Sequence, residues 1–379
     1  MRICVCTVVH HPEDARILHR QIRALLDGGH EVTYLAPFSA HGTTPWRSLT
    51  AVDVPRAHGL RRFGSLWTAR KALTERLRAS DLLIIHDPEL LLALPFLRNR
   101  PPTVWDVHED TASALVSKAW LPRPLRPLLW PLVRAAEMLA ERRLLLLLAE
   151  EGYRSRFRRA HPLVPNTTYV PTVAPRPPGT ERVVYLGHLS APRGVEELVE
   201  MARRLRPEGI EVELIGGADA QASRLLADAQ RNGLVRWRGY LSNGEALARL
   251  DGALAGLSLL HDLPNYRQSL PTKVVEYMAR GIPVVTTPLP SAAEIVTESG
   301  CGIVVPYEDP AGAVNAVLRL RDNEPSRVLM GRRGHETALL RFHWPRHGKA
   351  FVAQLEEWAA GRPSPADVGV DGGSQRERT

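Results

Sequence analysis

A lysine and a glutamate near the start of one short helix are the residues whose types and spacing first suggest chemistry. They are Lys273 and Glu276, in the stretch PNYRQSLPTKVVEYMARGIPVVTT at residues 264–287. A helix N-terminus offers free N–H groups and partial positive charge, so a phosphate binds well there. A carboxylate one turn further along can accept hydrogen bonds from the paired hydroxyls of a sugar. The pattern alone fits an ordinary amphipathic helix with two solvated charges equally well.

Histidines and carboxylates follow the buried strands that the sequence predicts in its first half. These strands are expected at residues 3–9, 82–85 and 103–107, each a short apolar run. In open α/β sheets the carboxyl ends of the strands line the ligand crevice, so polar groups gathered there favour a site. Each group alone is more typical of a cap or a loop, but the set favours a site. Its members are His10, His11, His86, Asp87, Asp106, His108, Glu109 and Asp110.

The loops around these strands match no common metal or dinucleotide motif. The sequence has no H-E-x-x-H and no paired cysteine ligands, so a metal site is not favoured. The loop VHHPEDAR after the first strand lacks G-x-G-x-x-G, which removes the main support for an oxidoreductase. A different glycine loop, GHLSAPRG at residues 187–194, lies between a predicted strand and a predicted helix. With Arg193 near that helix N-terminus, this loop is a candidate phosphate clamp.

Strands and helices alternate along the chain and position both the lysine–glutamate pair and the histidines and carboxylates at the strand ends. This alternation predicts an α/β fold of two doubly wound, Rossmann-like domains facing a cleft. The length of 379 residues also favours two domains. We expect the first domain at residues 1–170 and the second at 171–345, with a proline-rich linker at 165–180. A terminal helix at 346–361 is expected to pack back toward the first domain. Residues 362–379 are rich in Gly, Ser, Pro and charge, which predicts a disordered tail.

The net charge of +8 lies entirely in the first 170 residues, which carry 24 Lys and Arg against 16 Asp and Glu. Such a basic region fits nucleic acid, an anionic membrane or a phosphorylated substrate. No zinc-finger, RNA-recognition or helix-turn-helix signature accompanies it, so we expect no nucleic acid partner. The arginine-rich segment 118–159, with an amphipathic helix expected at 132–143, fits peripheral contact with an anionic membrane. A solvated outer helix is the more common interpretation of such a segment.

The cysteines and the hydrophobic runs predict a cytoplasmic protein. Three cysteines make no disulfide framework, because Cys4 and Cys6 share one face of a strand and Cys301 stands alone. No signal peptide opens the chain, and the longest apolar run, residues 144–148, is too short to span a bilayer. We therefore expect a cytoplasmic location, with the inner face of the membrane as an alternative peripheral position.

Several blocks of the sequence resemble the GT-B glycosyltransferases of family four, the retaining group that uses nucleotide sugars. The resemblance covers residues 1 to about 360 and is strongest in the stretch that contains Lys273. The blocks that carry it are YLGHLSAPRG, the pair Gly216–Gly217, RWRGYL, SLPTKVVEYMARGIPVV, AAEIV and GCGIVVP.

This resemblance implies that the second domain binds a nucleotide diphosphate sugar. Glu276 matches the second Glu of the family's Glu-x7-Glu motif, which binds the ribose, whereas the first Glu falls on Gln268, a departure from the pattern. In the glycine loop, the family's Arg falls on His188 and its Lys on Arg193, and we expect Lys273 to offset the lost charge. The implied donor-binding residues are Gly187, His188, Gly216, Gly239, Tyr240, Gln268, Ser269, Leu270 and Glu276.

The resemblance also implies roles in the first domain, which would face the acceptor. His108 matches the family's active-site histidine, and His10 and His11 fall in the loop that faces the acceptor. The implied catalytic residues are His108, Arg193 and Lys273, and the acceptor-side residues are His10, His11, His86, Asp87 and Glu109.

The implied activity is transfer of a hexose, with retention, to a hydroxyl of a glycan, a lipid-linked compound or a small natural product. UDP-sugar is the favoured donor and GDP-sugar the alternative, and no metal or other cofactor is expected. Arginine- and proline-rich composition suggests a bacterial source. The basic first domain suits a lipid-linked phosphate, a cell-surface glycan precursor or a small aminocyclitol-like acceptor, so we expect a role in cell-envelope or secondary-metabolite glycosylation. Two alternatives remain: a nucleotide-sugar 2-epimerase, and a non-catalytic sugar-nucleotide-binding partner suggested by Gln268 and His188.

Overall fold

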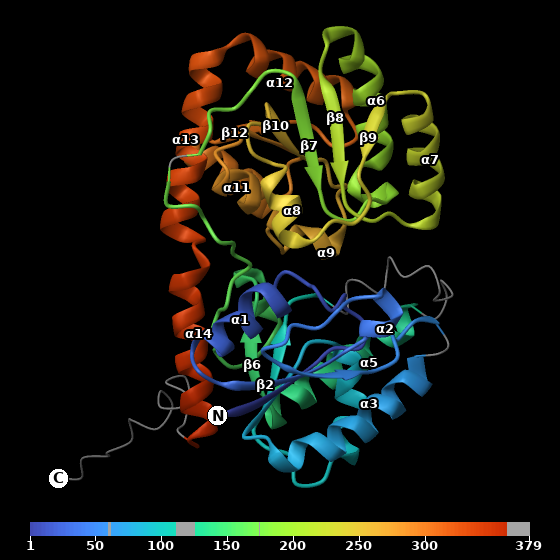
Figure 1. The fold of residues 1–379 in the computed structure, drawn as a ribbon, viewed down its shortest axis with the longest axis vertical. Helices are drawn as coiled ribbons and strands as arrows, with labels where there is room; N and C mark the ends of the chain where they lie inside the picture. The colour runs from blue at the N-terminus through green and yellow to red at the C-terminus, as the bar shows by residue number, and fades with distance from the viewer. Residues whose placement is uncertain (60–61, 111–125, 174, 362–379) are drawn as a thin grey trace, which may run out of the picture. The chain divides into compact units, whose positions relative to one another are not determined.

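The computed structural model describes residues 1–59, 62–110, 126–173 and 175–361, and it divides into two compact units (Figure 1). The first unit comprises Met1–Pro165 with Pro345–Thr379, and the second comprises Asn166–Trp344. The division after Pro165 falls inside the expected linker, a few residues before the expected boundary. The expected tail at 362–379 and the start of the arginine-rich segment at 118–125 lie outside the described residues.

The first unit contains a parallel sheet in the order β3-β2-β1-β4-β5-β6. Its central strands are uninterrupted apolar runs, as expected for strands that are covered on both faces. The edge strand β3 was not predicted, because its sequence TAVD is short and three of its four residues are exposed. The strands are β1 Arg2–Cys6, β2 Glu31–Ala36, β3 Thr50–Asp53, β4 Leu82–Ile85, β5 Thr103–Val107 and β6 Leu145–Leu148.

The helices of the first unit fall into two layers because the strand order reverses at β1. Parallel crossovers are right-handed, so the connections after β3, β4 and β5 all cover one face of the sheet. Leu73, Leu90 and Ala140, one from each connection, accordingly lie in a single core cluster. The first layer holds η1 Ile17–Ile22, α1 Arg23–Asp27 and α2 Phe38–His41, and the second holds α3 Arg62–Arg76, η3 Leu77–Ala79, η4 Pro88–Leu92, η5 Leu94–Phe96 and α5 Arg126–Arg143.

Helix α3 was not predicted from the sequence. Its inward side is apolar, with Leu66, Ala69 and Leu73 buried, but Phe63 and Trp67 point outward and obscure the amphipathic pattern. The same layer continues toward η8 Glu151–Arg156, which follows β6.

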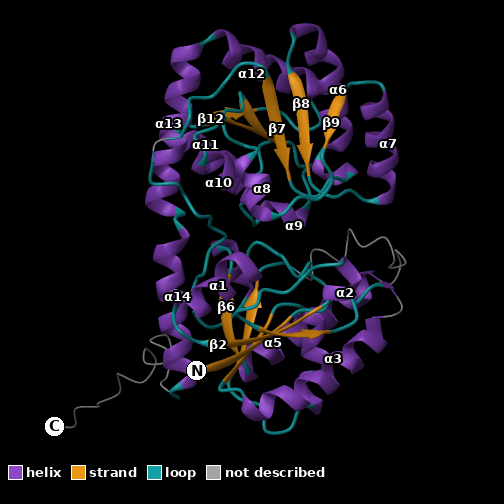
Figure 2. Cartoon of the chain, viewed as in Figure 1, coloured by secondary structure: helices purple, strands orange, loops and turns teal. Residues whose placement is uncertain are grey.

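The second unit contains another parallel sheet, in the order β12-β11-β10-β7-β8-β9 (Figure 2). Successive residues of its strand at 182–186 enter opposite cores: Val183 packs in one cluster with Leu198 and Val317, whereas Val184 packs in the other with Val274 and Ile295. The strands are β7 Arg182–Leu186, β8 Glu211–Ile215, β9 Val235–Trp237, β10 Ala255–Ser258, β11 Val284–Thr286 and β12 Gly302–Val304.

Helices cover both faces of the second sheet, which makes it doubly wound like the first (Figure 1). The α/β fold of two Rossmann-like units is therefore confirmed. The elements are η9 Ala191–Arg193, α6 Val195–Leu205, η10 Arg206–Glu208, α7 Ala220–Arg231, α8 Asn243–Ala248, α9 Pro264–Arg267, α10 Thr272–Ala279, α11 Pro290–Ser299, α12 Pro310–Asp322 and α13 Glu324–Arg341.

The last described helix, α14 Trp344–Ala359, belongs to the first unit almost entirely. Its Phe351, Leu355 and Trp358 are buried, and Glu356 Oε1 lies 3.2 Å from His30 Nε2. Among the described helices, none combines the length and the apolar character needed to cross a bilayer.

Candidate functional site

Glycines at the ends of three neighbouring strands bring the backbone of the second unit together at one point. Gly187 follows β7 with φ 121° and Gly216 follows β8 with φ 143°, both in the region that favours glycine. A Cβ at Gly216 would lie 2.0 Å from the Gly187 carbonyl oxygen, so no side chain fits there. The Gly216 N–H donates to the Gly239 carbonyl over 2.8 Å. The structure therefore brings three of the predicted donor-site residues together.

Lys273 of α10 extends its amino group toward this group of glycines. A Cβ built on Gly187 would lie 3.6 Å from Nζ, and the ammonium lies 3.6 Å from the centre of the Tyr185 ring. The side chain is buried, and Nζ has no hydrogen-bond partner within the described chain. Burial, together with the positive charge of Arg193, holds the pKa of Lys273 well below its usual value, against the opposing charge of Glu276.

Tyr277, one turn after Lys273, fixes α10 to the sheet. Its hydroxyl donates to the Leu257 carbonyl over 3.1 Å and accepts from the Leu186 N–H over 2.8 Å. The ring lies against Gly256, where a Cβ would come within 2.2 Å of it. This hydroxyl thus bridges two adjacent strands just before the glycine loop. Sequence analysis gave Tyr277 no role in the site, because the two bonds join segments far apart in the chain.

The charged residues near Lys273 come from two elements of the second unit. Arg193 ends η9, and its guanidinium lies 5.9 Å from the centre of the Tyr266 ring. The His188 carbonyl accepts from the Tyr185 hydroxyl over 2.8 Å. Burial and the charges of Arg193 and Lys273 lower the pKa of His188, which favours its neutral form. Glu276 is buried on the same helix as Lys273.

The other predicted donor residues lie nearer the surface. Gln268 is exposed at the C-terminal end of α9, and the Tyr240 ring is half exposed after β9. Ser269 and Leu270 are partly buried between α9 and α10, where Leu270 packs against the core. Their expected contacts with a donor stay predictions.

In the first unit, three strand ends bring histidines and carboxylates together as predicted. His108 Nε2 lies 2.9 Å from His10 Nε2, within hydrogen-bond distance. His10 Nε2 lies 3.2 Å from Asp87 Oδ1. Asp87 in turn accepts from the Thr7 hydroxyl over 2.9 Å and from the Val8 N–H. Asp87 therefore holds the loop after β1 in place as well as facing His10.

Asp106 is the centre of a second, fully buried set of contacts. Arg16 donates to it twice, from Nε over 2.8 Å and from Nη2 over 2.7 Å, and the Gln21 amide donates over 3.0 Å. His86 Nδ1 lies 3.2 Å and His108 Nδ1 3.5 Å from Asp106 Oδ2. Sequence analysis missed Arg16 and Gln21, since only the fold brings them to a strand about ninety residues away.

These contacts shift the pKa values of three groups. Burial alone would raise the pKa of Asp106, but the charge and hydrogen bonds of Arg16 outweigh it and hold the pKa well below its usual value. Burial alone would lower the pKa of His108, but the hydrogen bond and charge of Asp106 raise it. Burial dominates at His86 and lowers its pKa. The set therefore contains one histidine that favours its charged form and one that favours its neutral form.

His86, Asp106 and His108 have donor atoms within 4.8 Å of one another, close enough to share a metal ion. However, the Asp106 carboxylate is already occupied, because Arg16 neutralises it with two hydrogen bonds. A divalent cation at this point would also face the buried guanidinium at short range. The chemistry of these residues fits a proton-sharing network better than a metal centre.

Two predicted acceptor-side residues, His11 and Glu109, differ in their surroundings from the other residues predicted there. The His11 ring packs against His41, with 4.4 Å between ring centres, rather than against His10 or His108. Glu109 is exposed, but it joins His10, His86, Asp106 and His108 in lining a cavity of about 10 Å³. A space of that size holds about one water molecule and no sugar.

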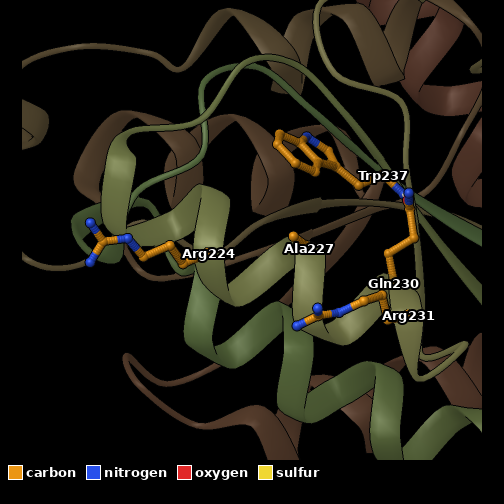
Figure 3. A pocket seen from close by; sticks show the side chains of 5 residues that line it. All are labelled: Arg224, Ala227, Gln230, Arg231 and Trp237. Atoms are coloured by element: carbon orange, nitrogen blue, oxygen red, sulfur yellow. The ribbon is translucent and has the colours of Figure 1, made fainter.

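A larger pocket, of about 510 Å³, lies on the second unit between α7 and β9 (Figure 3). Its Trp237 donates from Nε1 to the Gly216 carbonyl over 2.9 Å and so borders the glycine loop. The remaining lining residues are on the exposed side of α7 and were not predicted. They are Arg224, Ala227, Gln230 and Arg231.

Residues 180–323, most of the second unit, match the model of the glycosyl transferases group 1 family. Residues 180–323 therefore resemble a group 1 glycosyltransferase domain. This match confirms the family resemblance in the region that holds the glycine loop and Lys273.

Known proteins of similar sequence and structure have consistent names. A glycogen synthase of Mycobacterium tuberculosis is 27% identical over 179 residues, which is 46% of this chain and 42% of that protein, so the match spans less than half of the relative. Sucrose-phosphate synthase from Thermosynechococcus elongatus aligns with a TM-score of 0.74 and 17% identity over 95% of this chain and 99% of the other. HepE from Anabaena, solved with UDP-glucose, aligns with a TM-score of 0.69 and 13% identity over 94% of this chain and 100% of the other. These likenesses confirm the GT-B fold.

Proposed function

We propose that the protein is a retaining glycosyltransferase that moves a sugar from a nucleotide diphosphate sugar to an acceptor hydroxyl. The observation that carries the proposal is the buried Lys273 amino group, which faces Gly187 without a hydrogen-bond partner in the described chain. A buried cation without a partner is costly, and a diphosphate is the anion that the neighbouring glycine loop fits. The group 1 domain match over the same residues supports this substrate class.

In the proposed reaction, the acceptor oxygen attacks the anomeric carbon as the bond from that carbon to the diphosphate breaks. Attack comes from the side that the diphosphate leaves, which retains configuration, and the departing diphosphate takes the acceptor proton. Lys273 and Arg193 stabilise the negative charge that develops on the diphosphate. Glu276 holds the ribose hydroxyls. Because Arg193 and Lys273 supply this positive charge, we propose that no metal cofactor is needed.

For the donor, we favour a UDP-sugar over a GDP-sugar, in line with the UDP-glucose present in the HepE structure. The acceptor class is a hydroxyl of a glycan, a lipid-linked compound or a small natural product, which His108 and His10 would face. His108 favours its charged form and so can donate a hydrogen bond to a donor or acceptor oxygen.

The direct test incubates the protein with UDP-glucose and GDP-mannose and follows the products by NMR. We expect release of UDP with the first-formed sugar product in the donor's anomeric configuration, faster when an acceptor hydroxyl is added. Glu276→Ala should abolish the release, and Lys273→Met should slow it by roughly 10²–10³-fold. An inverted product, or full activity in both variants, would overturn the proposal.

A second candidate is a non-catalytic binder, because His188, whose pKa is lowered by burial, and the exposed Gln268 replace charged residues of the family pattern. A thermal-shift screen of UDP, GDP, ADP and TDP identifies the bound nucleotide in either case, because a ligand stabilises the state that binds it. Tight binding with no turnover across an acceptor panel would favour the binder. Conversion of the sugar itself without an acceptor would indicate a 2-epimerase.

A further inference from the structure

Helix α5 carries charged side chains inward and apolar side chains outward. Glu137 and Glu141 are only 2% and 4% exposed, whereas Leu132 and Leu139 are 63% and 48% exposed. A helix that covers a sheet normally has the opposite arrangement, with its apolar stripe facing the core. The outward face of α5 is therefore better suited to contact another apolar surface than to contact water.

Buried contacts fix this orientation of α5. Glu137 pairs with Arg134 over 2.7 Å and with Arg156. Glu141 accepts hydrogen bonds from the N–H groups of Arg158 and Arg159 over 2.7 and 2.8 Å. Rotating the helix to bury its leucines would break these contacts and leave charged groups unpaired, which is strongly unfavourable.

The outward residues of α5 form a regular helical stripe. Leu132, Ala135, Ala136 and Leu139 are all exposed and follow the spacing i, i+3, i+4 and i+7. The exposed pair Arg142–Arg143 ends the helix beside this stripe. Apolar residues flanked by arginine are typical of helices that lie in the plane of a membrane surface.

Neighbouring elements of the same layer extend the apolar surface. On α3, Phe63 and Trp67 lie one turn apart and are 74% and 64% exposed, and on η4 and η5 Leu92 and Phe96 are exposed. Arg62 Nη1 lies 3.5 Å from Glu89 Oε1, which joins the start of α3 to η4. Within the described part of the first unit, every large exposed hydrophobic residue lies on these elements. They are Phe63, Trp67, Leu92, Phe96, Trp130, Leu132, Met138 and Leu139.

The charge on this layer is positive. Glu137 and Glu141 are buried and paired, so the acidic side chains left on its outer side are few beside the arginines. Arg70 lies 4.0 Å from the centre of the Trp67 ring, and Arg134 lies 5.5 Å from that of Trp130. Tryptophan and arginine together suit the headgroup level of a bilayer, where aromatic rings are half buried and cations meet lipid phosphates.

We propose that this outer layer, formed by α3, η4, η5 and α5, is a docking surface for an anionic phospholipid bilayer. Positive charge selects anionic headgroups, and the apolar side chains of α5 and α3 enter the boundary between headgroups and acyl chains. One consequence rests on the proposed function: an acceptor held in that bilayer would be a lipid-anchored hydroxyl compound.

The test measures sedimentation of the full chain with vesicles of phosphatidylcholine alone or with phosphatidylglycerol added. We expect binding only to the anionic vesicles, weakened by salt. Arg142→Gln with Arg143→Gln should weaken binding roughly 30-fold, from about fivefold for each arginine near an anionic surface. Leu132→Gln with Leu139→Gln should weaken it at least about tenfold. All four residues are exposed, so the variants should keep their fold.

A matched control is Leu340→Gln, which removes an exposed leucine of α13 in the second unit. It should bind vesicles like the parent protein. Equal binding by the α5 variants and the parent, or no binding to anionic vesicles, would overturn the proposal. Self-association that the α5 variants abolish, without vesicle binding, would also overturn it and assign the surface to a second copy. UDP release from UDP-glucose is measured separately without vesicles, so failure of the proposed function is distinguishable from failure to dock.

Discussion

The buried charges at the two candidate sites, Asp106 in the first unit and Lys273 in the second, are treated in opposite ways. In the first unit, the Asp106 carboxylate meets Arg16, Gln21 and two histidines, so its charge is satisfied within the protein. In the second unit, the Lys273 amino group is buried against the Tyr185 ring and has no hydrogen-bond partner in the described chain.

This difference separates a buried charge that is paired within the protein from one that is not. A paired charge contributes to folding. An unpaired one lowers stability until a ligand supplies the missing partner. Substitution of Asp106 should therefore change stability most, and substitution of Lys273 should change ligand binding most.

Asp106→Asn should have the largest effect, because it removes the carboxylate charge that accepts two hydrogen bonds from the buried Arg16 guanidinium. We expect a loss of about 3–5 kcal/mol in the free energy of unfolding, as measured by urea denaturation. Adding Arg16→Met should restore a large part of the loss. The matched control is Asp81→Asn, which breaks the exposed pair with Arg2 and should cost at most about 1 kcal/mol. If Asp106→Asn and Asp81→Asn lowered stability equally little, the contacts of Asp106 would not be a main source of stability in the first unit.

Lys273→Met should lower catalysis without lowering stability, the opposite of Asp106→Asn. We expect kcat/KM for UDP-glucose to fall by roughly 10²–10³-fold, as when one group that stabilises transition-state charge is removed. Without nucleotide the variant should melt at the same or a higher temperature, because a buried unpaired amine has been replaced by an apolar chain of similar length. Lys349→Met, at an exposed lysine of α14, controls for the loss of a charge. A lower melting temperature with unchanged kcat/KM would show that Lys273 is a structural residue.

The fold was readable from sequence where strands are buried and periodicity is simple. The apolar run at β4 predicted a strand because burial on both faces of the sheet requires such a sequence. The glycine after β7 marked the loop that follows this strand. Edge strand β3 and helix α3 were missed because their exposed residues hide the pattern.

The candidate sites were readable only in part, for a related reason. Lys273, Glu276 and the glycine loop were predicted because phosphate binding uses local features, a helix start and a flexible backbone. Arg16 and Tyr277 could not be predicted, since their roles depend on partners in other elements. The inward orientation of Glu137 was missed as well, because Arg156, one of the two arginines that pair with it, follows β6.

The pH dependence of stability should distinguish His108 from His86. The pKa of His108 is raised in the folded state, so its stabilising effect is fully present below its ordinary pKa of about 6.5 and is lost as pH rises through the higher folded value. The pKa of His86 is lowered, so its effect is present above 6.5 and is lost as pH falls through the lower folded value.

Measuring the free energy of unfolding against pH for the parent and for His108→Gln checks this sign. The stability gap between the two should be about 1.5–3 kcal/mol in acid, the size of a hydrogen bond to a charged group, and should close as pH rises. His58→Gln, at an exposed loop histidine, should leave the profile unchanged. A gap that grows as pH rises would mean that the Asp106 network does not hold His108 in its charged form.

Gln268→Ala should have the smallest effect and sets the lower end of the comparison. Gln268 is exposed at the end of α9, so the free energy of unfolding should change by less than about 0.5 kcal/mol. If it accepts or donates one neutral hydrogen bond to the donor sugar, kcat/KM should fall about two- to tenfold, far less than for Lys273→Met. Gln268→Glu, which restores the family's carboxylate, tests whether charge at this position matters. A loss of more than 100-fold in Gln268→Ala would mean that the transition state is held on the sugar side of the donor as strongly as on the diphosphate side. In that case Lys273 would supply only part of the interactions by which the second unit stabilises the transition state.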